Sequence, residues 1–201
     1  MEGLGSTYYF DFENTAIQNL VSRAKEKSTS QIETIGHLYT MIRDHWWYDA
    51  FDISFEPEHY KASYIALKNK GNCVEKSILL IACLRAIEVP AKLHLGKVKN
   101  HIAAENLIRK IGTNELSPHG IVTAFIKGKW IKLSPVFNKE LCEKFKVAPL
   151  DFNPNESTYL QQFNAKGSLF MEYIEDYGTF DDVPLDFMKQ NIEEHYPGVF
   201  T

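Results

Sequence analysis

Cys73 stands where a thiol can become a nucleophile. It follows Gly71-Asn72 and begins a mostly apolar stretch, residues 73–87, that predicts a helix. The first N–H groups of a helix are unpaired and carry positive potential, which favours a thiolate and can hold an oxyanion. We therefore expect Cys73 to act as the nucleophile of an acyl-transfer reaction.

A nucleophilic cysteine also requires a base, which is usually histidine. His119 is the best candidate because it follows the turn residues Ser117-Pro118 and begins a strand-like run. A strand packed on the cysteine helix would bring His119 beside Cys73. His101 is expected either to line the site or to cap a helix at 102–111, and His94 is expected to be structural.

The remaining cysteines are expected to have packing roles, Cys83 on the apolar helix and Cys142 on a short helix. The sequence has seven His and three Cys, but no two of them show CxxC or HxxxH spacing. Zinc sites usually need such spacing. We therefore expect neither a metal nor a cofactor.

The elements that must position these residues follow from periodicity and turn residues. The helix at 73–87 is apolar almost all round, which is typical of a buried helix. The segment 91–98 alternates apolar and polar residues, and a glycine turn joins the runs 120–127 and 129–134, which indicates a hairpin. These patterns predict an α+β fold in which a buried helix packs on an antiparallel sheet.

We expect one domain over residues 1–201, with its core at about 30–140. Residues 31–47 have apolar side chains at spacings of three and four, which predicts an amphipathic helix. The segment 141–201 is rich in turn residues and aromatic residues. We expect it to wrap around the domain as a C-terminal extension.

Two segments together resemble a known family. GNCVEKSILLIACLRAIEVPAKL is similar to the nucleophile helix and following strand of the transglutaminase-like family, in the papain-like cysteine proteinase superfamily. HGIVTAFIKGKWIKLSP is similar to its second half, in which a His, a strand, a Gly-containing turn and a Trp precede the third catalytic residue. The resemblance covers about residues 30–140. It implies a transglutaminase-like fold with Cys73 and His119 as catalytic residues.

The chain departs from the family pattern at Ser134, where the family usually has Asp. An Asp there orients the histidine and stabilises its imidazolium, whereas Ser supplies no charge. The segment after it resembles a bacterial single-domain subgroup that has Thr or Ser at this position. Ser134 is therefore the first candidate for the orienting residue, and Asn138 and Asp151 are alternatives.

Three further residues are expected to contact the substrate: Asn72 directly before the nucleophile, Trp47 and His101. Trp46, Trp47 and Tyr48 end a predicted helix and are expected to form core or pocket wall. Related enzymes use an indole N–H in the oxyanion hole, so the resemblance makes Trp46 and Trp47 candidates for that role as well.

Charge is unevenly distributed along the chain, whose net charge is −4 at pH 7. The range 61–132 has thirteen Lys or Arg against four Glu, and 172–194 has eight acidic residues against one Lys. Either both are solvated faces, or the basic region forms a site mouth for acidic substrates. An acidic chain without a binding motif is not expected to bind nucleic acid.

Composition excludes several other classes. Hydrophobic residues make up 44% of 201 residues and no apolar run is long enough to span a membrane. The N-terminal residues have no secretory-signal pattern, and three cysteines cannot all pair within one chain. We therefore expect a reduced, cytoplasmic setting without membrane partners. The oligomeric state stays open.

Two functions remain. In the first, Cys73 attacks an amide or peptide carbonyl, His119 transfers the proton, and water releases the product from a thioester. The substrate would be a peptide, a protein or a small molecule with an amide, and hydrolysis is favoured over amine transfer. In the second, the chain is a binding or scaffold module that retains the fold without turnover, as the missing Asp suggests.

Overall fold

The computed structural model describes residues 2–102 and 104–200. Its helices are α1 (Thr15–Lys25), α2 (Gln31–His45), the short 3-10 helix η1 (Pro57–Tyr60), α3 (Ala62–Ala66), α4 (Cys73–Arg85), α5 (Ala104–Ile111), α6 (Lys139–Phe145) and α7 (Leu185–His195). Its strands are β1 (Trp47–Tyr48), β2 (Lys70–Gly71), β3 (Ala91–Asn100), β4 (Glu115–Ile126), β5 (Lys129–Leu133) and β6 (Met171–Phe180).

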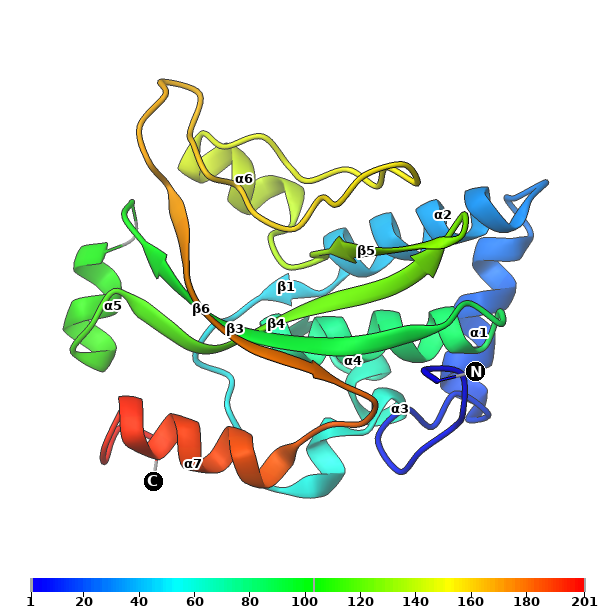
Figure 1. Ribbon diagram of the computed structural model, residues 1–201, viewed down its shortest axis with the longest axis horizontal. Helices are drawn as coiled ribbons and strands as arrows, with labels where there is room; N and C mark the ends of the chain where they lie inside the picture. The colour runs from blue at the N-terminus through cyan, green and yellow to red at the C-terminus, as the bar shows by residue number, and fades with distance from the viewer. Residues whose placement is uncertain (1, 103, 201) are drawn as a thin grey trace.

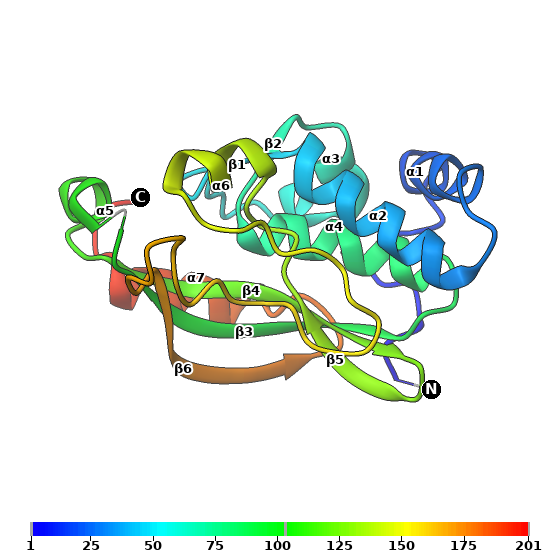
Figure 2. The same ribbon diagram turned by 90° about the horizontal axis from the view of Figure 1, so that it is seen from above.

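The main sheet is antiparallel, with the strand order β5-β4-β3-β6. Helices α1 to α4 form a layer on one side of it, and α4 lies against β4 and β3 (Figures 1 and 2). This arrangement confirms the α+β class and the buried helix on an antiparallel sheet. The observed α4, β3 and β5 begin and end close to the residues that the sequence patterns predicted. β4 differs, because it begins at Glu115, so Ser117-Pro118 and His119 lie inside the strand and not at a turn before it.

Helix α4 forms the centre of the core. Every one of its residues is buried, as expected for a helix that is apolar almost all round. Asn72 caps its N-terminus by accepting hydrogen bonds from the backbone N–H groups of Val74 and Glu75, while Glu75 accepts one from the backbone N–H of Asn72. This capping box fixes the first turn, which carries Cys73.

Lys76 ties the first turn of α4 to its neighbours. The side chain is fully buried, and its ammonium donates to the carbonyl oxygens of Arg43, Trp46 and Val136 at 2.7–2.8 Å. Burial lowers the pKa of Lys76 to about 7. Three acceptors satisfy the three donors of the group, so the end of α2 and the chain after β5 are held against α4.

A short parallel pairing of two strands holds the segment that directly precedes Cys73. β1 pairs with β2 so that Trp47 lies opposite Lys70 and Tyr48 lies opposite Gly71. Gly71 and the helix cap Asn72 are both buried directly before Cys73. The pairing therefore anchors the chain immediately before the nucleophile to the end of α2.

Residues 171–195 contain two elements that the sequence patterns did not predict. β6 pairs with β3 and forms an edge of the sheet, and α7 packs against β4 (Figure 1). Asn191 of α7 accepts a hydrogen bond of 2.7 Å from the Ser117 hydroxyl, and the Tyr196 hydroxyl accepts one of 2.6 Å from the Ser117 backbone N–H. The acidic range 172–194 thus consists largely of these two elements.

Candidate active site

The Cys73 thiol lies beside the backbone on both sides of His119. Its sulfur is 4.0 Å from the carbonyl oxygen of Pro118, and the Gly120 backbone N–H also contacts it. These two peptide groups point toward the same edge of β4. The pairing of β4 with β5 ends at Val122 opposite Leu133, so the first turn of α4 meets β4 where β5 no longer borders it.

Burial sets the protonation state of this thiol. It raises the pKa of Cys73 to about 11, while the backbone N–H groups of Gly120, Val74 and Cys73 stabilise the thiolate and partly oppose the increase. The side chain is only 7% exposed. The expectation of a thiolate favoured by the helix N-terminus is therefore corrected for this closed site, because desolvation exceeds the effect of the N–H groups.

His119 is buried on β4, opposite Gly96 of β3. Burial lowers the pKa of its imidazole to about 4, so the ring is neutral at pH 7. Within the described part of the chain, its Nδ1 has no hydrogen-bond partner and no hydrogen bond joins the ring to Cys73. The structure thus places the Cys73 sulfur next to the peptide groups that flank His119. Direct contact between the thiol and the imidazole stays a prediction.

Ser134 is the candidate orienting residue that shares a cavity with His119. It lies directly after β5 and is buried, and its carbonyl oxygen accepts a hydrogen bond from the Tyr39 hydroxyl. Both residues line a small cavity of about 10 Å³ together with Tyr159, Gln161 and Met171, among other residues. The fold therefore keeps Ser134 close to the imidazole.

The two alternatives to Ser134 are engaged elsewhere. The Asn138 side chain accepts a hydrogen bond from the Tyr48 backbone N–H at 3.3 Å and donates one to Glu140 at 2.8 Å. The Asp151 carboxylate is 79% exposed and forms an ion pair with Arg43. Neither side chain lines the cavity beside His119.

The residues expected to contact the substrate divide into two groups. Asn72 lines the pocket that contains the thiol, although its side-chain polar atoms serve the helix cap and the Asp52 carbonyl. Trp47 is 56% exposed, and neither it nor His101 lines that pocket. His101 instead lies 3.3 Å from Glu172. The indole N–H of Trp46 donates to the Ile65 carbonyl and is therefore committed to the core.

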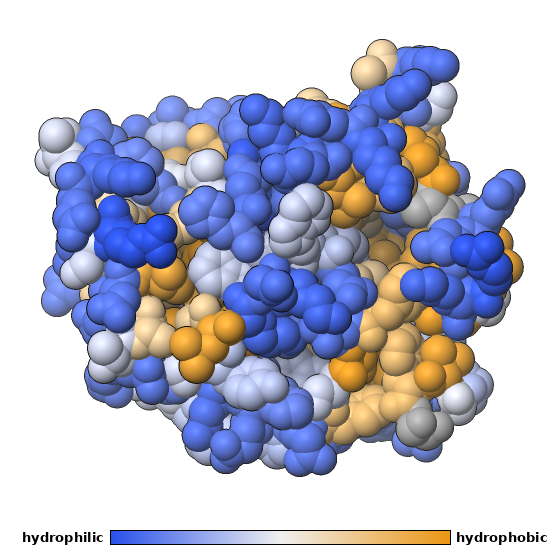
Figure 3. Space-filling model, turned by 180° about the vertical axis from the view of Figure 1, so that it is seen from behind, coloured by the Kyte–Doolittle hydropathy of each residue, from blue (hydrophilic) through white to orange (hydrophobic). Residues whose placement is uncertain are grey.

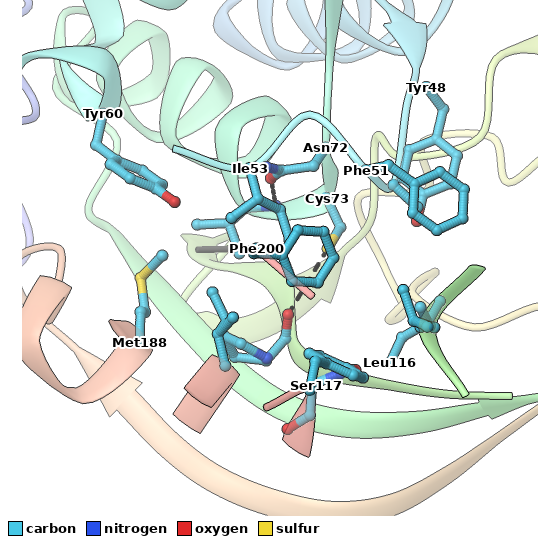
Figure 4. Close-up of a pocket in the computed structure, with 16 residues that line it drawn as sticks. Tyr48, Phe51, Ile53, Tyr60, Asn72, Cys73, Leu116, Ser117, Met188 and Phe200 are labelled. Carbon is cyan, nitrogen blue, oxygen red and sulfur yellow. Dashed lines mark hydrogen bonds between the residues drawn. The ribbon is translucent and has the colours of Figure 1, made fainter. Parts of the chain in front are cut away.

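Cys73 opens into an apolar pocket of about 40 Å³ (Figure 4). Three tyrosines line it, Tyr48, Tyr60 and Tyr196, and the C-terminal segment closes one side with Met188, Ile192 and Phe200. Tyr48 was expected to form core or pocket wall, and it lines this pocket. No local signal in the sequence linked Tyr60 or the C-terminal residues to the thiol.

A larger groove of about 260 Å³ adjoins this pocket and shares Tyr48, Phe51 and Leu116 with it, among other residues. It runs between α5 and α6, and both Lys110 and Lys144 line it. Figure 3 shows apolar side chains gathered on the side of the molecule where α5 and the C-terminus lie. The groove therefore combines apolar walls with two lysines.

No group of three or more His, Cys, Asp or Glu within residues 2–102 and 104–200 is arranged to hold a metal ion. None of the helices in those ranges is both long enough and apolar enough to cross a membrane.

Comparison with known proteins places the chain in a family. Residues 18–135 match the model of the transglutaminase-like superfamily. The chain belongs to this superfamily, and the matched residues include both Cys73 and His119. Family membership supports a cysteine-dependent enzyme in general. No curated protein matches the chain.

The chain is similar to solved structures. One is a protein of Cytophaga hutchinsonii solved as a candidate cysteine protease, with 17% identity over 89% of this chain and a TM-score of 0.53. The alignment covers 46% of that longer chain. Another is a TGase with 20% identity over 60% of this chain and 30% of its own, with a TM-score of 0.39. The chain thus spans about half the length of the first of these proteins.

Proposed function

We propose that this protein is a cysteine-dependent acyl-transfer enzyme that hydrolyses an amide or peptide bond. The observation that carries the proposal is the position of Cys73 at the N-terminus of α4, between the Pro118 carbonyl and the Gly120 N–H of the strand that bears His119. The sulfur thus lies against the peptide groups on both sides of His119, which supports the pairing of a nucleophile and a base from different elements.

The reaction would begin with transfer of the Cys73 thiol proton to His119 as the sulfur attacks the substrate carbonyl carbon. The carbonyl oxygen becomes an oxyanion, for which the N–H groups around the sulfur are the available donors. The carbon–nitrogen bond then breaks, and His119 returns the proton to the leaving amine. Water attacks the resulting thioester, and the acid and the free thiol are released.

The neutral resting pair fits this sequence of steps. With the pKa of Cys73 near 11 and that of His119 near 4, the proton resides on sulfur before substrate binds. Charge separation would therefore occur together with attack, not before it. We infer a slow enzyme whose thiol is protected between turnovers.

The groove between α5 and α6 is the proposed route to the thiol. Its apolar walls suit an apolar side chain of a peptide, and Lys110 and Lys144 suit an acidic group beside it. The basic region of the sequence, 61–132, contributes one of these lysines. A peptide or protein with adjacent apolar and acidic residues is the proposed substrate class.

A second candidate function is a binding module that does not turn over. The closed thiol pocket and the absence of a carboxylate from the described lining of the His119 cavity favour it. Both functions use the same groove, but only the enzyme needs the sulfur. They are therefore separated by the effect of removing it.

The deciding experiment incubates the protein with a library of peptide amides and traps the acyl-enzyme by acid quench before intact-mass analysis. We expect a mass increase equal to the acyl group in the wild type and none in Cys73→Ala. Cys83→Ala, which changes a buried packing thiol, is the matched control and should retain the adduct. Groove binding that is equal in the wild type and Cys73→Ala, with no adduct in either, would establish the binding module instead.

A further inference from the structure

One wall of the pocket into which Cys73 opens lies outside the part of the chain that matches the superfamily. The match covers residues 18–135, whereas the pocket is also lined by Met188 and Ile192 of α7 and by Tyr196, which directly follows the helix. Residues four apart lie on the same face of a helix. The three side chains therefore form one stripe of α7 that faces the thiol.

Hydrogen bonds to β4 hold this wall in place. The Asn191 side chain accepts a bond of 2.7 Å from the Ser117 hydroxyl. The Tyr196 hydroxyl accepts one of 2.6 Å from the Ser117 backbone N–H and donates one of 3.0 Å to the Glu115 carbonyl. Because these bonds fix α7 on the strand, the side chains of its stripe, such as the buried Met188, set how much space remains beside the sulfur.

The pocket is small and apolar. Its volume is about 40 Å³, and one buried water needs about 10–15 Å³ of such space, so there is room for about three atoms of that size. None of the described residues that line it carries a charge. The Tyr60 hydroxyl already donates to the Ser54 carbonyl, as the Tyr196 hydroxyl does to that of Glu115. A charged group would be buried there without a partner, which is costly.

The position of the pocket indicates which part of a substrate it receives. The groove proposed as the route to the thiol shares Tyr48 and Phe51 with the pocket, whereas Met188 lies on the other side of Cys73 (Figure 4). The acyl part of a substrate stays bonded to the sulfur as the thioester. Its α-carbon and side chain must therefore fit between the sulfur and the α7 stripe.

We propose that Met188 and Ile192 determine the acyl specificity of Cys73, by limiting the residue on the acyl side of the scissile bond to a small apolar one, with alanine as the best fit. The α-carbon and one methyl group fill most of the available space, and a branched side chain such as that of leucine meets the Met188 thioether. This inference rests on the proposed function for turnover, but the fit itself requires only the thiol and the pocket.

The fit is tested with acetyl-alanyl and acetyl-leucyl chloromethyl ketones, which carry an acyl residue but no leaving amine. The Cys73 sulfur bonds to the methylene carbon and chloride leaves, so mass spectrometry of the Cys73 peptide gives a rate for each reagent, divided by its rate with free cysteine. We expect the wild type to prefer the alanyl reagent at least tenfold. In a hydrophobic pocket one methylene changes selectivity by about 10–200-fold, so Met188→Ala should reduce this preference tenfold or more.

Leu185→Ala is the matched control, because Leu185 is a buried residue of the same helix that does not line the pocket. It should retain the wild-type preference. Ile192→Val removes one methylene and should shift the preference in the same direction as Met188→Ala, which keeps the test intact if the larger change prevents folding. No preference in the wild type, or an equal loss in Leu185→Ala and the pocket variants, would overturn the inference.

Turnover separates this inference from the proposed function. The wild type should hydrolyse alanyl amides with a kcat/KM at least tenfold above that for leucyl amides, and Met188→Ala should narrow the ratio. Hydrolysis with equal kcat/KM for the two amides would overturn the acyl specificity and leave the proposed function standing. Selective alkylation without any hydrolysis would count against the proposed function, while the fit of the pocket would still stand.

Discussion

Gly120 and Val74 meet backbone to backbone, since a β-carbon on Gly120 would lie only 2.7 Å from the Val74 Cα. This approach brings the Gly120 N–H to the Cys73 sulfur. Any side chain at position 120 must push β4 away from α4. The separation between strand and helix therefore fixes the geometry of the nucleophile.

Gly120→Ala should consequently lower the free energy of unfolding and make the Cys73 thiol more accessible to alkylation. Forcing a methyl group into a close-packed contact costs about 1–3 kcal/mol. Urea unfolding should show a loss of this size, and iodoacetamide should label Cys73 faster in the variant. Gly5→Ala is the matched control, because a β-carbon at Gly5 meets no atom within 4 Å. Equal stability in the two variants would contradict the contact.

Alkylation of Cys73 should be slow at neutral pH and should increase up to about pH 11. With a pKa near 11, about one thousandth of the thiol is ionised at pH 8. The rate should therefore rise about tenfold per pH unit over this range, as followed by mass spectrometry of the Cys73 peptide. Cys83→Ser and Cys142→Ser remove the background from the other thiols. A plateau near pH 8.5 would show an ordinary, exposed thiol.

The neutral His119 should make the fold sensitive to acid. Its pKa is lowered from 6.5 to about 4, so between these values the unfolded chain binds a proton that the folded chain excludes. Stability is present above pH 6.5 and decreases as pH falls toward 4, by about 3 kcal/mol in total. Urea unfolding at pH 7 and pH 4.5 should show a smaller decrease in His119→Gln than in the wild type. The same decrease in both would contradict the lowered pKa.

Ser134→Ala should reduce turnover if its hydroxyl helps to orient His119, whereas Ser134→Asp should keep activity within a small factor or raise it. Asn138→Ala is the informative comparison, since the Asn138 side chain bonds to Tyr48 and Glu140. Steady-state kinetics on the substrate found by acyl-enzyme trapping gives kcat for each variant. Full activity in Ser134→Ala would remove Ser134 from the site.

Phe200→Ala should open the thiol pocket and raise the Cys73 alkylation rate several-fold, because the Phe200 ring forms part of the pocket wall. The neighbouring Val199 is 41% exposed and does not line the pocket, so Val199→Ala should leave the rate unchanged. An equal effect of both changes would indicate general loosening of the C-terminal segment and not the loss of a specific cover.

The sequence was most informative where pattern and burial agree. α4 is apolar almost all round, and the β4–β5 hairpin turns at Gly128 with φ of 79°, which glycine adopts without strain. β6 was missed because most of its residues are partly or fully exposed and four of its ten residues, Glu172, Glu175, Asp176 and Gly178, are of types that strands disfavour. Its pairing with β3 outweighs those local preferences.

The site was predictable only in part, for a related reason. Cys73 carries a local signal, the start of a helix, whereas His119 lies inside β4 and not at the strand start that the pattern indicated. The Phe200 cover has no local signal, because it reaches the site only through the packing of elements distant in sequence. The protonation states of Cys73 and His119 could not be predicted from the sequence either, because their desolvation depends on the same packing.

The position of β6 and α7 after the nucleophile helix in chain order bears on the exposure of the thiol during synthesis. A ribosome makes the nucleophile helix and the β3–β4–β5 strands first, and domains begin to fold while synthesis continues. Until α7 docks on β4, the walls that Met188, Ile192 and Phe200 provide are missing, and the Cys73 thiol of the nascent chain faces water. Oxidants and electrophiles therefore have their best access to this cysteine before α7 has docked.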